Sequence, residues 1–249
     1  MNCKELDIKR VQNRLLEMGK VIADILERNN IPYMITFGTL LGAVRHGGFI
    51  PWDDDFDIFL FDDTYEKAMQ IIEKNLPEDM FLETSKSEPL YFHSFAHVKD
   101  LKSEALCKHY PHDSIYAHKG LSIDLYKAVA MKESELEEFL LKENLAYLNR
   151  RKKINSISPE EYNRKVSIIT QQLKNIVKNN SNKEIYGIAL PERSMDLNYV
   201  LPLKKIRFED TEFWGPGNPE GLLESFYGNY MQLPPEEKRI PHYDYVRFL

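Results

Sequence analysis

An acidic stretch that runs directly into an apolar one, residues 38–61 (GTLLGAVRHGGFIPWDDDFDIFLF), constrains the fold more than any other feature of this chain. It holds four glycines and four aspartates, and its apolar end predicts a buried strand. Because side chains alternate between the faces of a strand, Asp55 and Asp57 are predicted on one face and apolar side chains on the other. Asp53 joins the acidic face if the strand begins early enough. Carboxylates held side by side next to a core repel one another and resist desolvation, so the pattern predicts a cation between them.

The segments around this stretch alternate between helical and strand patterns. Apolar residues at helical spacing predict a first helix that ends near residue 30 (Val11, Leu15, Met18, Ile22, Ile25). Alternating helices and strands are typical of an α/β fold, in which helices flank a sheet. The next predicted elements are a buried strand (33–37), a short helix (38–46), a second strand (55–61) and an acidic helix (62–76).

The pattern changes along the chain, and we expect three segments. Strand-like runs between residues 80 and 126 extend the sheet of a catalytic core at residues 1–130. Two helical patterns from 132 to about 180 predict a helical appendage at residues 131–200. Residues 201–249 are rich in proline and aromatic residues, and we expect this segment to pack back onto the core and the site as ordered loops.

Composition indicates which classes of partner and which cellular compartment fit this protein. With 39 acidic and 33 basic residues, the net charge of −6 argues against a nucleic-acid partner, which needs a basic surface. Cys3 and Cys107 are the only cysteines, which favours the reducing cytoplasm. No apolar run approaches the roughly 20 residues that span a bilayer. We therefore expect a cytoplasmic protein without a transmembrane segment, and a peripheral contact with the inner membrane face if its acceptor is lipid-linked.

A third carboxylate comes from a later strand. In the run SIDLY, Ile123 and Leu125 share one face and Asp124 takes the other, so Asp124 can meet Asp55 and Asp57 from a neighbouring strand. Hard carboxylate oxygens without Cys or His favour Mg²⁺ or Mn²⁺, which commonly bridge proteins to substrate phosphates. The set predicts phosphoryl-transfer chemistry.

The start of the acidic stretch offers a site for an anion. Gly38 and Thr39 lie where a strand end meets a helix N-terminus, whose free N–H groups and dipole attract a phosphate. Arg45 follows and is placed to neutralise phosphate oxygens by a bidentate contact. Each feature alone has a structural interpretation, since Gly-Thr pairs commonly cap helices and D-x-D pairs are common at strand ends. In this order along one chain they predict a functional site.

Histidine and aromatic residues add two further hypotheses. Five histidines near Cys107 suggest zinc, but their spacing fits no standard zinc pattern (His93, His97, His109, His112, His118). Contacts with the donor or acceptor, or plain surface positions, suit them better. We expect one or two aromatic residues of the last segment to stack on a sugar or to enclose a quaternary ammonium, and the others to lie in the core (Trp214, Phe226, Tyr227, Tyr230, Tyr243).

The residues FGTLLGAVRHGGFIPWDDDFDI resemble the signature of the LicD family of phosphocholine transferases, which is related to the fukutin-type proteins within the nucleotidyltransferase superfamily. FAHVKD, GLSIDLY, FEDTEFWGP and YGNYMQLPPEEKRIPH resemble further segments of that family. The resemblance implies a nucleotidyltransferase-like mixed β-sheet core flanked by helices. It implies catalytic residues (Asp55, Asp57, Asp124), metal ligands (Asp53, Asp55, Asp57, Asp124) and substrate contacts (Gly38, Thr39, Arg45, His97, Lys99, Arg239, His242). His97 and Lys99 stand where this family is expected to have Lys and Arg.

The function that the resemblance implies is Mg²⁺-dependent transfer of a substituted phosphate. Phosphocholine from CDP-choline is the expected group, and a hydroxyl of a cell-surface glycan precursor, such as lipopolysaccharide or teichoic acid, is the expected acceptor, with release of CMP. Ribitol, glycerol or ethanolamine phosphate donors could use the same site. Two alternatives stay open: a nucleotidyltransferase that moves NMP from an NTP to a sugar phosphate, small molecule or protein, and a non-catalytic nucleotide-binding protein. The intact carboxylate set argues against the second.

Overall fold

A mixed β-sheet forms the centre of the computed structural model, which describes residues 7–107, 115–177, 180–189 and 192–249. In its central five strands β2 and β6 run parallel and the other neighbours run antiparallel. The spatial order is β1 (Tyr33–Ile35), β2 (Asp57–Phe61), β6 (Ser122–Lys132), β4 (Ala96–Asp100) and β3 (Met80–Glu83). This arrangement confirms the predicted α/β fold.

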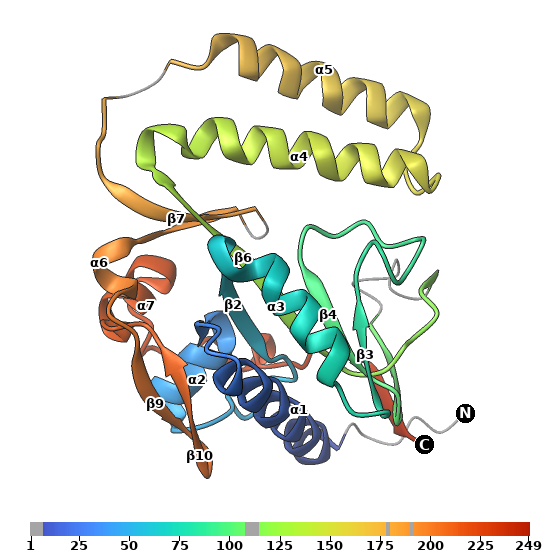
Figure 1. Ribbon diagram of the computed structural model, residues 1–249, viewed down its shortest axis with the longest axis vertical. Helices are drawn as coiled ribbons and strands as arrows, with labels where there is room; N and C mark the ends of the chain where they lie inside the picture. The colour runs from blue at the N-terminus through green and yellow to red at the C-terminus, as the bar shows by residue number, and fades with distance from the viewer. Residues whose placement is uncertain (1–6, 108–114, 178–179, 190–191) are drawn as a thin grey trace.

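Two helices cover one face of the sheet (Figure 1): α1 (Ile8–Arg28) and α3 (Asp62–Asn75), which also contact each other. The Asp7 side chain caps α1 by accepting a hydrogen bond from the N–H of Arg10. The apolar positions predicted to face the core are all buried (Val11, Leu15, Met18, Ile22, Ile25). The first helix is therefore confirmed, and its periodicity is the reason that it packs on the sheet.

The second half of β6 extends the sheet. The strands β7 (Glu184–Ile188) and β8 (Arg193–Asp196) follow it in antiparallel order, β7 on β6 and β8 on β7. The sequence analysis predicted no strands in this part of the chain, because the runs are short and each acquires its pairing only from the long strand beside it. The strand-like run at 90–99 is likewise a strand only from Ala96 on.

A pair of helices, α4 (Leu136–Lys153) and α5 (Pro159–Asn175), lies at the top of Figure 1 and confirms the two helical patterns. A short 3-10 turn, η2 (Glu133–Glu135), leads from β6 into α4. The pair has a small apolar core of its own (Leu141, Leu148, Ile157, Ile169). The division of the chain at residues 130 and 200 stays a prediction.

The last segment passes around the core in short elements. The helix α2 (Phe37–His46) contacts α7 (Pro219–Tyr227), and β11 (Tyr245–Phe248) pairs with β5 (Ser103–Leu106). Before α7 come α6 (Leu197–Val200) and the hairpin of β9 (Lys204–Phe208) and β10 (Thr211–Gly215), and η3 (Glu236–Lys238) lies between α7 and β11. Residues of the last segment thereby contact the carboxyl end of α2, where Tyr230 meets Arg45, and the loop before β2, where His242 meets Asp54.

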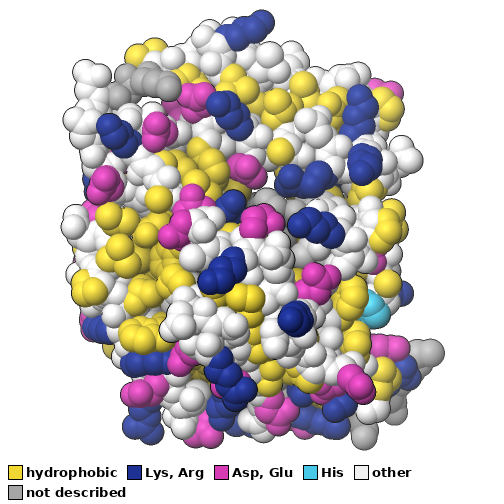
Figure 2. Space-filling view, viewed as in Figure 1, with side chains coloured by type: hydrophobic (Ala, Val, Ile, Leu, Met, Phe, Trp, Pro, Cys, Tyr) yellow, Lys and Arg dark blue, Asp and Glu magenta, His cyan; other side chains and the backbone are white. Residues whose placement is uncertain are grey.

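The outer surface mixes charges of both signs. In the view of Figure 2, basic and acidic side chains are interspersed, with hydrophobic side chains between them. Among the residues that the structure describes, none of the helices combines the length and the apolar character needed to cross a bilayer.

Candidate active site

The strand register brings two of the predicted carboxylates together. Asp57 is the first residue of β2, and its register partner on the parallel strand β6 is Asp124. Adjacent strands lie about 4.8 Å apart, so the two side chains are neighbours on one face of the sheet. On the opposite face Ile58, Ile123 and Leu125 are buried in the core. The alternation in the sequence is therefore what directs both carboxylates to the same side.

Asp53 and Asp55 approach the same place from the loop before β2. All four predicted carboxylates line one cavity of about 530 Å³. Its other lining residues are mostly aromatic or small (Phe37, Gly38, His93, Phe95, His97, Cys107, Ser122, Tyr126, Arg193, Tyr227, His242, Tyr243). We call this cavity the carboxylate cavity.

Burial and mutual repulsion make this cavity electrostatically costly. Burial, with the Asp55 charge next, raises the pKa of Asp53 to about 8. The same two causes hold the pKa of Asp57 well above its ordinary range, with further contributions from Asp124 and Asp53. Burial also raises the pKa of Asp124, although His97 opposes the rise. A hard divalent cation would relieve this repulsion, and an all-oxygen set suits Mg²⁺ or Mn²⁺. The residues present therefore fit the expected ion.

His97 and Tyr126 fix the position of Asp124. The Tyr126 hydroxyl donates to Asp124 Oδ2 over 3.0 Å, and His97 Nε2 lies 3.5 Å from Asp124 Oδ1. On its other side, His97 Nδ1 lies 3.1 Å from the fully buried Glu83 carboxylate. His97 therefore acts as an orienting group between two carboxylates. The sequence patterns gave no sign of Glu83, which comes from β3.

Asp54, the middle aspartate, ties the last segment to the site. It is fully buried and accepts hydrogen bonds from the backbone N–H groups of His242 and Tyr243, both at 2.8 Å. His242 Nδ1 lies 3.2 Å from Asp54 and 2.7 Å from Asp55. These contacts, Asp54 first, raise the pKa of His242 to about 12. The sequence patterns did not single out Asp54, because its partners His242 and Tyr243 come from the far end of the chain.

A tight acidic cluster results from this arrangement. Among the described residues, Asp53, Asp54, Asp55 and His242 each offer a ligand atom within 4.8 Å of the others. Asp57 and Asp124 lie deeper on the strands and complete the acidic wall of the cavity. Since Asp54 already binds the last segment, the carboxylates with oxygens facing the cavity are the better candidate ligands.

The glycine-threonine element positions carboxylates in this structure, and its contact with an anion stays a prediction. Thr39 is buried, and its hydroxyl accepts a hydrogen bond from the N–H of Asp57 over 2.8 Å. A Cβ added to Gly38 would lie 2.8 Å from Asp53 Oδ2. Both residues of α2 therefore position aspartates: Thr39 holds the start of β2, and Gly38 leaves room for Asp53.

Three predicted cations lie outside the lining of the carboxylate cavity. Arg45 donates to the carbonyl of Tyr230 over 2.7 Å, and Arg239 lies over the ring of Trp52 and donates to a backbone carbonyl. Lys99 is buried on β4, on the same face as His97. Side-chain packing decides these positions, and sequence spacing could not reveal it.

One basic residue that the sequence analysis did not single out does line the cavity. Arg193 belongs to β8 and reaches the carboxylate cavity beside Tyr227. Two of the five aromatic residues considered from the sequence, Tyr227 and Tyr243, also line it. The histidines His109 and His112 of the zinc alternative lie outside the described residues.

Phe37 marks the entrance to α2 and is strained. Its φ of 44° lies in the left-handed region, where a bulky residue costs about 1–3 kcal/mol. Ring contacts hold it there: its centroid lies 5.0 Å from Phe59, 5.3 Å from Tyr126 and 5.6 Å from Phe226. The strain aims an aromatic ring into the cavity.

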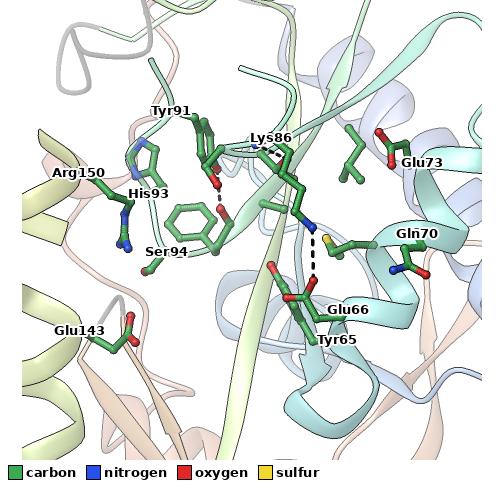
Figure 3. Close-up of a pocket in the computed structure, with 16 residues that line it drawn as sticks. Tyr65, Glu66, Gln70, Glu73, Lys86, Tyr91, His93, Ser94, Glu143 and Arg150 are labelled. Atoms are coloured by element: carbon green, nitrogen blue, oxygen red, sulfur yellow. Dashed lines mark hydrogen bonds and ion pairs between the residues drawn. The ribbon is translucent and has the colours of Figure 1, made fainter. Parts of the chain in front are cut away.

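A second cavity of about 240 Å³ adjoins the first (Figure 3). His93 and Phe95 line both, so the two cavities are neighbours. Figure 3 shows residues of α3 on one side and Glu143 and Arg150 of α4 on the other. Arg150 Nε donates to the carbonyl of Phe92 over 2.8 Å, which fastens α4 to the core. There is therefore room for another chemical group beside the carboxylates.

Comparisons with known proteins agree with this geometry. The family described as "LicD/FKTN/FKRP, nucleotidyltransferase domain" matches residues 30–140, the range that contains all four carboxylates. Lipopolysaccharide cholinephosphotransferase LicD of Haemophilus influenzae is 26% identical over 96% of this chain and 97% of its own length. An uncharacterized Rickettsia prowazekii protein is 28% identical over 84% of the chain and 71% of its own length.

A shorter match reaches the animal members. Human ribitol 5-phosphate transferase FKRP is 40% identical over 47 residues, which make up 19% of this chain and 10% of that protein. Residues 30–140 of this chain therefore resemble the nucleotidyltransferase domain of the LicD family, and the similarity to Haemophilus influenzae LicD extends over nearly the whole chain.

Proposed function

We propose that this protein transfers phosphocholine from CDP-choline to a hydroxyl of a cell-surface glycan precursor and releases CMP. Similarity to the LicD family domain and to lipopolysaccharide cholinephosphotransferase LicD supports a transferase that moves a substituted phosphate. The observation that carries the proposal is that the four carboxylates implied by the family resemblance line one cavity (Asp53, Asp55, Asp57, Asp124). A lipopolysaccharide or teichoic acid precursor is the proposed acceptor, in a cytoplasmic setting.

The lining of the carboxylate cavity favours choline as the head group. Aromatic rings surround the acidic wall, from Phe37, Tyr126 and Tyr227 among others. Aromatic faces with nearby carboxylates attract a quaternary ammonium, whereas a polyol needs hydrogen-bond donors and acceptors. This lining supports phosphocholine over ribitol and glycerol phosphate as the proposed group.

The four cavity carboxylates would hold Mg²⁺, or Mn²⁺. Such an ion supplies charge neutralisation of the phosphate oxygens and lowers the pKa of an attacking hydroxyl. The acceptor oxygen forms a bond to the phosphorus that bears choline, the bond from that phosphorus to the bridging oxygen breaks, and CMP leaves with the electron pair.

Asp124 is the candidate base for the proton of the acceptor hydroxyl. Tyr126 and His97 hold its two oxygens at the cavity wall, which orients the carboxylate toward the proposed acceptor. We place the acceptor on the side of the second cavity, which shares His93 and Phe95 with the first. Thr39 and Gly38 keep Asp57 and Asp53 in position.

The test is release of CMP from CDP-choline with glycan acceptor, with and without Mg²⁺, alongside CDP-ribitol, CDP-glycerol and CTP. Asp57→Asn should abolish turnover with an unchanged circular dichroism spectrum, because it removes a ligand charge while relieving repulsion at a buried site. Asp63→Asn, an exposed acid in the first turn of α3, is the matched control and should retain wild-type activity.

Other results of this test would contradict the metal-ligand role, the group transferred or the reaction itself. Full activity of Asp57→Asn refutes the metal-ligand role. Pyrophosphate released from CTP indicates a nucleotidyltransferase, and preference for another CDP-linked donor changes the group transferred. Absence of both turnover and nucleotide binding in the wild type indicates a non-catalytic protein.

A further inference from the structure

We propose that Arg193 binds the phosphates of the CDP-linked donor in the carboxylate cavity. Among the described residues that line this cavity, Arg193 is the only lysine or arginine. The cations expected from the sequence, Arg45, Lys99 and Arg239, do not line it. A donor with two phosphates needs a positive partner besides any ion held by the carboxylates. The inference rests on the proposed function, because it takes the donor to occupy this cavity.

The sheet extension brings Arg193 to the site. Arg193 is the first residue of β8, opposite Ile188 of β7, and β7 pairs with β6. The strand β6 is the one that carries Asp124 near its start. Arg193 and Asp124 are therefore carried by one continuous sheet, which fixes their backbones relative to each other.

The contacts of Arg193 hold its guanidinium without using all its donors. Nη1 donates to the carbonyl of Phe226 over 3.1 Å, at the C-terminal turn of α7, where carbonyls lack helical partners. The guanidinium carbon lies 5.2 Å from the Phe226 ring centroid and 5.8 Å from that of Tyr227. A guanidinium has five N–H donors in a planar fork. One bond to a carbonyl leaves others for a bidentate contact with phosphate.

Electrostatics place Arg193 across from the acidic wall. Burial raises the pKa of Tyr227, the Asp57 carboxylate raises it further, and the Arg193 guanidinium lowers it. Tyr227 is therefore within electrostatic reach of both charges. A diphosphate in the cavity would meet the carboxylate side through a cation and the Tyr227 side through Arg193 directly.

The experiment compares binding of CDP-choline, in Mg²⁺, to the wild type, Arg193→Gln, Arg193→Lys and Arg151→Gln by calorimetry. Cytidine, the phosphate-free ligand, is followed by ligand-observed NMR. Arg151 is the matched control, because it also hydrogen-bonds a backbone carbonyl and lies 5.9 Å from an aromatic ring centroid, that of Phe92, but is outside the cavity lining.

We expect Arg193→Gln to weaken CDP-choline binding about 10- to 100-fold, the usual effect of losing a charge-assisted hydrogen bond. Cytidine binding should stay unchanged. Arg193→Lys should recover part of the affinity, since it restores charge without the fork. Arg151→Gln should bind CDP-choline like the wild type.

Several results would overturn the inference. One is that a folded Arg193→Gln binds CDP-choline within about twofold of the wild type. The others are equal losses for cytidine and CDP-choline, and the same loss in Arg151→Gln. A wild type that uses another CDP-linked donor contradicts the choline proposal alone, and the same titration with that donor then tests Arg193. A wild type that binds no nucleotide overturns both.

Discussion

Replacing Gly38 by alanine separates the demands of the site from those of the fold. The new Cβ would lie 2.8 Å from Asp53 Oδ2, whereas ordinary contact begins near 3.4 Å, so the carboxylate must move by about 0.6 Å. The fold can accommodate this shift, because the obstacle is the end of a side chain. Alanine also favours a helix by up to about 1 kcal/mol relative to glycine, and Gly38 has no positive φ that would oppose it.

Gly38→Ala should lower the catalytic rate even though the fold tolerates it. A displacement of about 1 Å in a catalytic group can cost about 100-fold in rate. We therefore expect Gly38→Ala to lower kcat/KM for CDP-choline about 10- to 100-fold, equivalent to about 1.4–2.7 kcal/mol of transition-state stabilisation. Its Tm should equal or exceed that of the wild type. CMP release and a thermal melt on the same preparation measure both quantities.

Gly42→Ala, one turn later in α2, is the matched control. Its Cβ would collide with the carbonyl oxygen of Gly48, a backbone atom that cannot turn aside. This variant should lose Tm, since the tight connection after α2 must open. Wild-type turnover in Gly38→Ala, or a Tm below that of the wild type, would show that Gly38 does not act by making room for Asp53.

The remaining predictions concern stability. Asp54→Ala should cost about 3 kcal/mol of unfolding free energy and speed tryptic cleavage of the C-terminal segment, because two backbone N–H groups lose a charged acceptor; unchanged proteolysis would contradict this. Arg14→Gln should cost roughly 3 kcal/mol in urea unfolding at pH 7, because Arg14 lies 2.7 Å from the fully buried Asp100. Arg14 also pairs with Asp79, and Lys102, and then Arg14, lower the pKa of Asp79. The stability that comes from the Arg14–Asp79 pair is therefore present above the unfolded pKa of about 3.9 and is lost as pH falls through the lower folded pKa. The gap between wild type and Arg14→Gln should therefore narrow below about pH 4, and a gap that widens there would refute the assignment.

Local periodicity accounts for most of what the sequence revealed. The helical spacing of the first segment and the alternation in DFDIFLF and SIDLY predicted buried faces that the structure confirms. Such patterns are readable because each arises from the repeat of one backbone conformation. They direct Asp57 and Asp124 to one side of the sheet, and the register then makes them neighbours.

The cationic side of the site was not readable in this way. Arg45 follows the signature closely, yet it bonds the Tyr230 carbonyl, while Arg193 reaches the cavity from 136 positions beyond Asp57. An arginine has a long flexible stem, so its spacing along the chain says little about where its guanidinium lies. Packing against α7 and pairing with β7 settle that instead.

The sequence by itself predicted the secondary structure around the acidic stretch, singled out four carboxylates and carried the resemblance to the LicD family. Only the tertiary structure decided that Asp54 binds the last segment, that Thr39 and Gly38 position aspartates, and that Arg193 completes the lining of the cavity. The physical reason is the distance along the chain over which each effect acts. Alternation and helical repeat act over a few residues, whereas these contacts join parts of the chain that meet only when the sheet and the last segment pack together.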